Sequence, residues 1–357
     1  MDLQARPMQP RDTRECAAIV AGHPVIGPRY GSKIQCLQAV WSGLLAGEAM
    51  RTDVYEEVDG SRIRLCGFGV GVFVSDDFIR EIKTQPLHWF GPQLVQRISE
   101  GRSPVLADEQ VREFNSGQGL NLIVWEACLH SEFEKRTDLF HLMVEAFLRC
   151  YRGFLLKEMI TSQVESVPRL KWAVDAGGLY WDAKNASYTD SLKGSAEKFI
   201  GDPHIVGVTR KLEYGRLGSW VGSLFDYNPP RFGFAPSEQR LLEAALSAER
   251  GTDSELGELL GVSLSAIKKL WLSIYRRVTD RRAETLQDFA PSGSHERGKE
   301  KRRRLLAYVR EHPEELRPVS HAVSKQQRTN PPASKSVRKK TPMKDRVHPN
   351  PQEGENR

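Results

Sequence analysis

Glu126 is the residue of this chain whose type and position first suggest chemistry. It follows the apolar run Leu120–Trp125, which is typical of a buried strand. A carboxylate at such a position could take a proton from a reacting group as a general base. A glutamate at the end of a strand is more often simply solvated, so we assign no catalytic residue and expect that the chain is not an enzyme.

The glycines at positions 67, 69 and 71 form a Gly-x-Gly-x-Gly pattern, which could belong to a phosphate-binding loop. Such a loop would lead directly into a helix. Here the glycines alternate with Phe68, Val70 and Val72, as residues of a strand do. We therefore expect a flat sheet face without side chains, open to contact with a ligand.

Neither the cysteines nor the histidines are spaced as metal ligands. The five cysteines include no Cys-x-x-Cys pair, so we expect reduced, mostly buried thiols. The nine histidines include no His-x-x-x-His pair, although His130 and His141 could flank a pocket. We expect no metal and no cofactor.

Positive charge is concentrated near the end of the chain. Residues 291–357 hold 17 Lys and Arg against 8 Asp and Glu, a net of +9, whereas the whole chain has a net charge of +6. Lys301–Arg310 could extend a helix, but the stretch from Pro318 is rich in Pro, Ser and Asn, so we predict that residues 291–357 form a largely disordered basic tail that attracts polyanions. No run of about 18 apolar residues could cross a membrane, so we expect a cytoplasmic protein without a membrane partner.

A helix-turn-helix is predicted between residues 233 and 290. Pro236 suits the first position of a helix, and Thr252 or Asp253 can cap a second one. Gly261 can end that helix in the left-handed conformation. In the third helix Ile267, Trp271, Ile274 and Val278 share one inward stripe, and six Lys and Arg lie between positions 264 and 282 against one acid, Asp280. An anionic target would therefore meet the third helix first, as DNA meets a recognition helix.

The same residues resemble a LuxR-type helix-turn-helix. The likeness rests on Ala235-Pro236-Ser237-Glu238, on the run from Ser254 to Ser263, on Ala266-Ile267-Lys268 and on Ile274-Tyr275-Arg276-Arg277. It implies sequence-specific binding of double-stranded DNA, often as a homodimer. By position, Lys268, Lys269 and Leu272 would face base edges, Arg276, Arg277 and Arg281 would contact phosphates, and Ser265 would also lie at the DNA. Ala235, Gly257 and Leu270 depart from the family pattern.

Residues 1–232 are expected to form a mixed α/β domain. Leu37, Trp41, Leu44 and Leu45 recur at helical spacing, Asp59-Gly60 predicts a hairpin turn before the strand Ile63–Val74, and a long helix carries Leu139 to Phe154. After the opening Leu3-Gln4-Ala5-Arg6-Pro7, this element order resembles that of GNAT acetyltransferases. The acetyl-CoA loop of that family, Arg/Gln-x-x-Gly-x-Gly/Ala, is absent after Leu120–Trp125. A sensory PAS- or GAF-like domain would also fit.

The expected architecture is therefore a GNAT-like or sensory α/β domain (1–232), an all-α helix-turn-helix domain (233–290) and a disordered basic tail (291–357). It predicts a transcriptional regulator whose first domain senses a small-molecule effector or dimerises. The alternative is an acetyltransferase-like enzyme that the helix-turn-helix tethers to DNA or to a DNA-bound partner. A protein-docking role for the helices is a third possibility.

Overall fold

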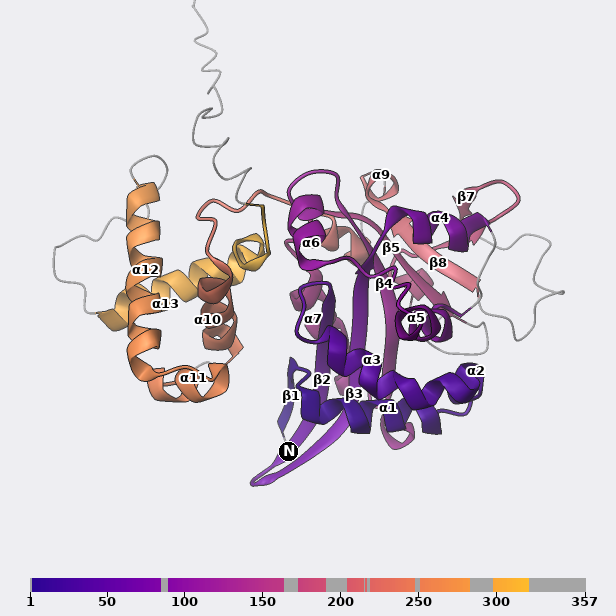
Figure 1. Cartoon of the computed structure of the whole chain (residues 1–357), viewed down its shortest axis with the longest axis horizontal. Helices are drawn as coiled ribbons and strands as arrows, with labels where there is room; N and C mark the ends of the chain where they lie inside the picture. The colour runs from indigo at the N-terminus through magenta and orange to yellow at the C-terminus, as the bar shows by residue number, and fades with distance from the viewer. Residues whose placement is uncertain are drawn as a thin grey trace, which may run out of the picture.

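The computed structural model describes residues 2–84, 89–163, 173–190, 204–214, 216, 219–247, 251–282 and 298–320. A mixed α/β part built on one sheet comes first, and a group of helices follows it (Figure 1). The expected fold class is confirmed.

The sheet has eight strands in the order β1-β2-β3-β4-β5-β8-β6-β7. Its strands are β1 (Asp2–Pro7), β2 (Met50–Asp59), β3 (Arg62–Val74), β4 (Leu120–Leu129), β5 (Leu156–Gln163), β6 (Leu179–Asp182), β7 (Ser187–Thr189) and β8 (His204–Thr209). Each pair of neighbours is antiparallel except β4 and β5, which are parallel and joined by a crossover through a helix. The predicted strands Ile63–Val74 and Leu120–Trp125 are confirmed as parts of β3 and β4.

Helices cover both faces of this sheet. One face packs on α1 (Thr13–Gly22), α2 (Gly27–Tyr30), α3 (Ile34–Leu44), α4 (Asp76–Thr84) and α5 (Phe90–Ser99). The other face packs on α6 (Asp108–Asn115), α7 (Thr137–Tyr151) and the short helix Trp220–Leu224. A further single turn, α9 (Arg210–Glu213), follows β8. On the first face Trp41 meets the ring edges of Phe68 and Trp125, which ties α3 to the two central strands.

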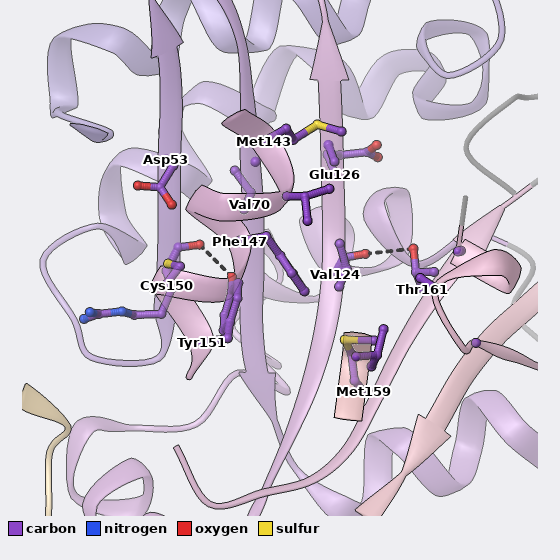
Figure 2. Close-up of a pocket in the computed structure, with 18 of the residues that line it drawn as sticks. Asp53, Val70, Val124, Glu126, Met143, Phe147, Cys150, Tyr151, Met159 and Thr161 are labelled. Atoms are coloured by element: carbon purple, nitrogen blue, oxygen red, sulfur yellow. Dashed lines mark hydrogen bonds between the residues drawn. The ribbon is translucent and has the colours of Figure 1, made fainter. Parts of the chain in front are cut away.

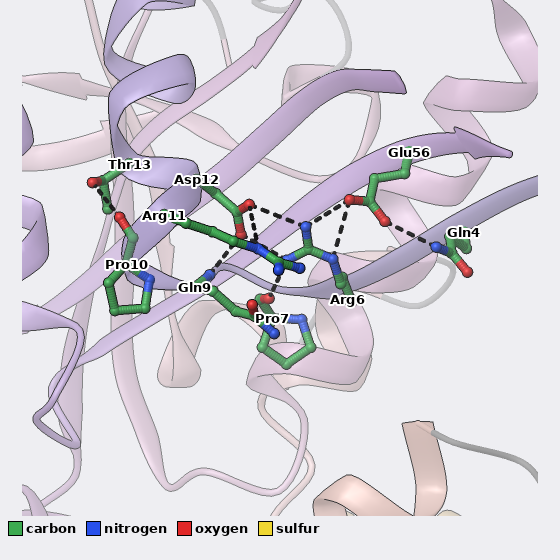
Figure 3. Close-up of polar contacts among 9 residues, drawn as sticks. All are labelled: Gln4, Arg6, Pro7, Gln9, Pro10, Arg11, Asp12, Thr13 and Glu56. Carbon is green, nitrogen blue, oxygen red and sulfur yellow. Dashed lines mark hydrogen bonds and ion pairs between the residues drawn. The ribbon is translucent and has the colours of Figure 1, made fainter. Parts of the chain in front are cut away.

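A cluster of ion pairs between the half-buried Arg6 and two buried carboxylates fixes β1 to the rest of the sheet (Figure 3). The Arg6 guanidinium lies 2.6 Å from Asp12 Oδ2 and 2.6 Å from Glu56 Oε1. Asp12 also accepts the backbone N–H of Gln9 at 2.7 Å. Burial alone would raise the pKa of Asp12, but these hydrogen bonds and the Arg6 charge outweigh it and hold the pKa below its ordinary value. The cluster joins β1, β2 and the entry to α1.

The three helices predicted between residues 233 and 290 are present as far as residue 282. They are α10 (Pro236–Ser247), α11 (Asp253–Leu260) and α12 (Leu264–Arg282). Thr252 caps α11 in a capping box with Glu255, and Gly261 ends it in the left-handed conformation, both as predicted. A Cβ on Gly257 would come within 2.8 Å of the Val262 carbonyl oxygen, so the tight turn explains why glycine stands there.

Residues 298–320 are ordered and are not a disordered tail, although a helix over Lys301–Arg310 was allowed by the sequence. Gly298–Glu311 forms a fourth helix, α13, whose Leu305, Tyr308 and Val309 are buried with residues of α10 and α12. The chain then packs against the sheet domain: Arg317 donates to the carbonyl oxygens of Arg149 and Arg152 at the end of α7. The remainder of the predicted tail, 291–297 and 321–357, lies outside the described residues, as do residues 283–290 of the predicted helix-turn-helix domain.

A carboxylate from α10 completes the contact between the two parts. Glu243 lies 2.9 Å from Arg51 of β2 and 3.6 Å from Arg317. Arg317 is only 3 % exposed, and burial lowers its pKa to about 10. The buried Arg317 and the half-buried Arg51 therefore share one carboxylate where the helices meet the sheet.

Candidate functional site

Strands β4 and β5 lie side by side over only part of their length. Their paired residues run from Leu120 opposite Leu156 to Val124 opposite Thr161, where the Thr161 hydroxyl donates to the Val124 carbonyl at 3.3 Å. β4 continues to Leu129. Among the described residues no strand pairs with this second half of β4 on the β5 side. The two strands therefore diverge at the centre of the sheet.

A β-bulge lies where the divergence begins. Val70 of β3 pairs with Glu126 and Gly71 pairs with Val124, so Trp125 is an extra residue in β4. Both Trp125 and Glu126 contact Tyr30 of α2: the indole N–H donates to Tyr30 Oη at 3.1 Å, and Tyr30 Oη donates to Glu126 Oε1 at 2.7 Å. The bulge thus turns two successive side chains toward the same partner.

Glu126 is not a solvated residue at the end of a strand, contrary to our expectation. It lies inside β4 and is 7 % exposed. A Cβ at Gly91, in the first turn of α5, would lie 2.0 Å from Tyr30 Oη and 2.9 Å from Glu126 Oε1, so only glycine leaves room for this pair. Burial and the neighbouring carboxylate raise the pKa of Tyr30 well above its ordinary value, which keeps its hydroxyl a hydrogen-bond donor.

A cavity of about 150 Å³ lies beside the divergence, between α7 and the sheet (Figure 2). Its floor includes Val124 and Glu126 of β4 and Met159 of β5, and its wall includes Met143 and Phe147 of α7. Val206 of β8 and Val221 close the far side. The walls are mostly apolar, and Glu126 borders them, while its carboxylate is hydrogen-bonded to Tyr30 on the opposite face of the sheet.

The end of the cavity next to β2 is polar. Arg51, Thr52 and Asp53 line it, and Asp53 lies 3.6 Å from Arg149. Burial raises the pKa of Asp53 to about 6, although the charges of Arg149 and Arg51 oppose the rise. Cys150 also lines this end, and burial raises the pKa of its thiol to about 12, so it is not a thiolate nucleophile.

The glycines of β3 do not leave an open face. A Cβ on Gly69 would lie 2.6 Å from the Tyr55 hydroxyl oxygen, and one on Gly71 would lie 2.3 Å from that of Tyr151. Two buried tyrosines fill the space above the glycines. The expectation of a bare sheet face is therefore wrong at these two positions.

The loop between β4 and α7 does not fit a nucleotide diphosphate. Asp138 stands in the first turn of α7 and accepts the N–H of Leu139 at 3.0 Å, where an anion would otherwise bind. Arg136 is already bonded to Asp138 and lies 3.2 Å from Glu57. Glu132 is paired with Arg64. Apart from the exposed Lys135, the charged residues of this loop and of the first turn of α7 are therefore acidic or already paired.

The predicted DNA contacts divide into two groups on α12. Ser265, Lys268, Lys269, Leu272 and Arg276 are exposed, and Leu272 is 68 % exposed. Arg277 instead lies 2.9 Å from the buried Glu238 of α10, and Arg281 donates to the carbonyl oxygen of Arg231. The first group shares an outward face, whereas the second also holds the helices together.

The remaining candidate residues do not gather into a site. None of the five cysteines forms a disulfide, and Cys16, Cys66 and Cys128 are buried. His130 and His141 are exposed and do not line the cavity. Over the described ranges, no group of three or more His, Cys, Asp or Glu is placed to hold a metal ion. Within that part of the chain, no helix is long and apolar enough to cross a membrane.

Sequence reasoning identified Glu126 but missed its partners. Tyr30 and Gly91 lie far from it in the sequence, and no local pattern connects the three. The bulge was also missed, because it depends on the register between β3 and β4. Trp125 beside Glu126 at the end of the apolar run was the one available signal.

Comparison with known proteins finds no matching family model and no matching curated protein. Solved structures do match. Arabidopsis thaliana NAA60 with a bisubstrate analogue is 13 % identical with a TM-score of 0.33, covering 58 % of this chain and 98 % of its own. The aminoglycoside acetyltransferase AAC(6')-Ib with coenzyme A is 11 % identical with a TM-score of 0.31, covering 60 % and 98 %. A GNAT-family acetyltransferase from Streptococcus pneumoniae is 11 % identical with a TM-score of 0.31, covering 58 % and 99 %.

The expectation that this chain is not an enzyme is overturned by these matches, since each is an acetyltransferase. At such low identity and TM-score they assign no activity, which has to be argued from the site. Nothing in the comparisons supports the LuxR-type resemblance. The strand order with its one parallel pair, β4 and β5, gives the first part of the chain a GNAT acetyltransferase-like fold.

Proposed function

We propose that the sheet domain is an acyltransferase that moves an acyl group from a thioester to an amine, with Glu126 as the general base. The observation that carries this proposal is the bulge at Trp125. It sets a buried carboxylate at the point where β4 and β5 diverge, at the edge of an apolar cavity. A thioester could enter that cavity, and an amine would approach Glu126.

The proposed reaction balances without a further reagent. The amine nitrogen forms a bond to the thioester carbonyl carbon, and the carbon–sulfur bond breaks. The amine loses one proton to the Glu126 carboxylate, the departing thiolate takes up one proton from water to become a thiol, and Glu126 then returns its proton to the solvent. The products are an amide and a free thiol.

Tyr30 has a positioning role in this proposal. Its hydroxyl donates to Glu126 Oε1 and accepts from the Trp125 indole, so it holds the carboxylate in one orientation. Gly91 supports the same arrangement because any side chain there would displace the tyrosine hydroxyl. A fixed carboxylate loses little entropy when the amine binds.

Thiol release tests the proposal with Glu126→Gln, which keeps the shape and removes the base. Hexanoyl-CoA would be the donor, and spermidine, lysine and a short peptide the acceptors, with the acylated amine identified by mass spectrometry. We expect the rate at saturating donor to fall by about 10²- to 10⁴-fold, with unchanged donor affinity. Glu145→Gln, at an exposed glutamate of α7, is the matched control.

Tyr30→Phe should lower kcat by about tenfold, the effect of one net hydrogen bond, while the donor Kd stays the same. A Glu126→Gln enzyme as fast as the wild type would contradict the role of the carboxylate. The absence of thiol release with every donor and acceptor would contradict acyl transfer itself.

A second function, binding of duplex DNA by α12, is favoured by one observation. Ser265, Lys268, Leu272 and Arg276 lie at helical spacing and are all exposed. The acyltransferase would then be carried to DNA or to a DNA-bound partner. The homodimer and the nonspecific affinity of the basic tail are parts of this proposal.

In vitro site selection with the full chain tests DNA binding. Lys268→Ala with Lys269→Ala should abolish selective binding, because each lysine can donate to guanine in the major groove. Lys301→Ala with Arg303→Ala removes the same charge from exposed positions of α13 and should only weaken binding slightly. Equal loss in both double variants would contradict a recognition role for α12.

A further inference from the structure

The cavity beside Glu126 is larger than an acetyl group needs. A cavity of comparable volume lined by apolar residues accepts benzene, which has six carbon atoms. The methyl of an acetyl group would leave most of the roughly 150 Å³ unfilled, and the lining side chains would lose contact with a ligand atom. The volume therefore fits a chain of about six carbons.

The lining of the cavity suits an aliphatic chain along most of its length. Phe140, Met143 and Phe147 follow one face of α7, and Met159 and Val221 oppose them. Methionine and phenylalanine side chains adapt to a flexible chain without offering it hydrogen bonds. The polar end formed by Arg51 and Asp53 would disfavour a chain that reached it, which limits the length.

The diphosphate of a nucleotide thioester would find few hydrogen-bond or ion-pair partners on this protein. The acidic first turn of α7 and the existing pairs of Arg136 and Arg64 oppose binding of a diphosphate there. Affinity for a donor must then come mainly from its acyl part.

We propose that the thioester donor is recognised by a medium-length acyl chain, about six carbons long, that occupies this cavity, and that a nucleotide diphosphate adds little. This inference rests on the proposed acyl transfer and specifies its donor. Each buried methylene strengthens binding about fourfold. A hexanoyl thioester has four more methylenes than an acetyl thioester and should therefore bind about 250-fold more tightly.

Calorimetric titration of the full chain with acetyl-CoA, butanoyl-CoA, hexanoyl-CoA and hexanoyl-pantetheine tests the inference. We expect affinity to rise along the first three donors and hexanoyl-pantetheine to bind within about threefold of hexanoyl-CoA, since the lost diphosphate contacts amount to less than one ordinary hydrogen bond.

Two variants change the cavity in opposite directions. Val144→Phe narrows it and should move the preferred chain toward butanoyl, whereas Phe147→Leu enlarges it and should move the preference toward octanoyl. Because either shift suffices, failure of one variant to fold leaves the other as a test.

The outcomes separate the two proposals. Equal affinities for acetyl-CoA and hexanoyl-CoA would overturn the acyl-chain inference and leave acyl transfer standing. Binding of hexanoyl-CoA without binding of hexanoyl-pantetheine would overturn the minor role of the diphosphate. If no thioester binds, the proposed function fails, and this inference fails with it.

Discussion

Replacing Gly69 by alanine should destabilise the sheet domain, and replacing Tyr55 by phenylalanine in the same chain should restore most of the loss. The Cβ of the new alanine would lie 2.6 Å from the Tyr55 hydroxyl oxygen and 3.7 Å from the carbon that carries it. The first distance is a clash and the second is an ordinary contact. The hydroxyl alone therefore stands in the way.

The size of the effect follows from how little room Tyr55 has to move. The tyrosine is only 2 % exposed and packs with Cys66 and Leu129. Forcing extra volume into a packed core costs about 1–3 kcal/mol. In a double-mutant cycle, Gly69→Ala and Tyr55→Phe should therefore couple by at least about 1 kcal/mol, the double variant being more stable than the sum of the single changes predicts.

Urea unfolding of the four proteins, followed by tryptophan fluorescence, measures this coupling. Gly71→Ala is the contrasting control, because its Cβ would also lie 3.1 Å from the Ile123 carbonyl oxygen and 3.1 Å from a Leu122 methyl group. Tyr151→Phe should not rescue it, since the backbone contact remains and the Tyr151 hydroxyl donates to the Arg51 carbonyl at 3.0 Å. Additive free energies for Gly69 and Tyr55 would refute the steric explanation.

Three further changes test the electrostatics and the helix caps. Asp53→Asn should stabilise the chain increasingly as the pH rises from 4 to 7, by about 3 kcal/mol above pH 7. The reason is that burial raises the pKa of Asp53 from 3.8 to about 6, so the wild type loses stability as this group ionises. If the pKa were ordinary, urea unfolding over this range would show a stability difference that does not depend on pH. Arg317→Met should lower the free energy of unfolding by about 3–5 kcal/mol, because it leaves two carbonyl groups at the end of α7 without their donor. Limited proteolysis should then cut between the two parts of the chain, and an unchanged digestion pattern would argue against this contact. Thr252→Ala should lower the stability of the helical part by about 1 kcal/mol by removing the cap of α11, and an unaltered thermal melt would count against the cap.

Features set by neighbouring residues were predictable from the sequence. Pro236 begins a helix, Thr252 caps the next one and Gly261 ends it, because each of these effects acts within a few residues. The buried stripe of α12 that includes Trp271 followed from its period alone.

The fate of residues 298–320 was not predictable in the same way. Local reasoning allowed a helix over Lys301–Arg310, but the highly charged composition indicated no partner for it and favoured a solvated chain beyond it. Glu315 is fully buried because it accepts the N–H groups of Arg231 and Phe232, more than 80 residues earlier. Arg317 is buried against carbonyls of α7 for a similar reason. Buried charges that find distant partners leave no local signal.

The candidate site was only partly predictable from the sequence. Glu126 was identifiable as a carboxylate after an apolar run, but its burial was not. The bulge at Trp125, the hydroxyl of Tyr30 and the space at Gly91 come from three separate segments. Only the assembled sheet brings them to the place where β4 and β5 diverge.

A crystal structure of the full chain with a thioether analogue of hexanoyl-CoA, which cannot transfer its acyl group, tests the central claim most directly. We predict electron density for the chain between α7 and the sheet, against Phe147 and Met159, with the sulfur close to the divergence of β4 and β5 and to Glu126. An analogue bound elsewhere on the chain, or a cavity without density at millimolar analogue, would contradict the account.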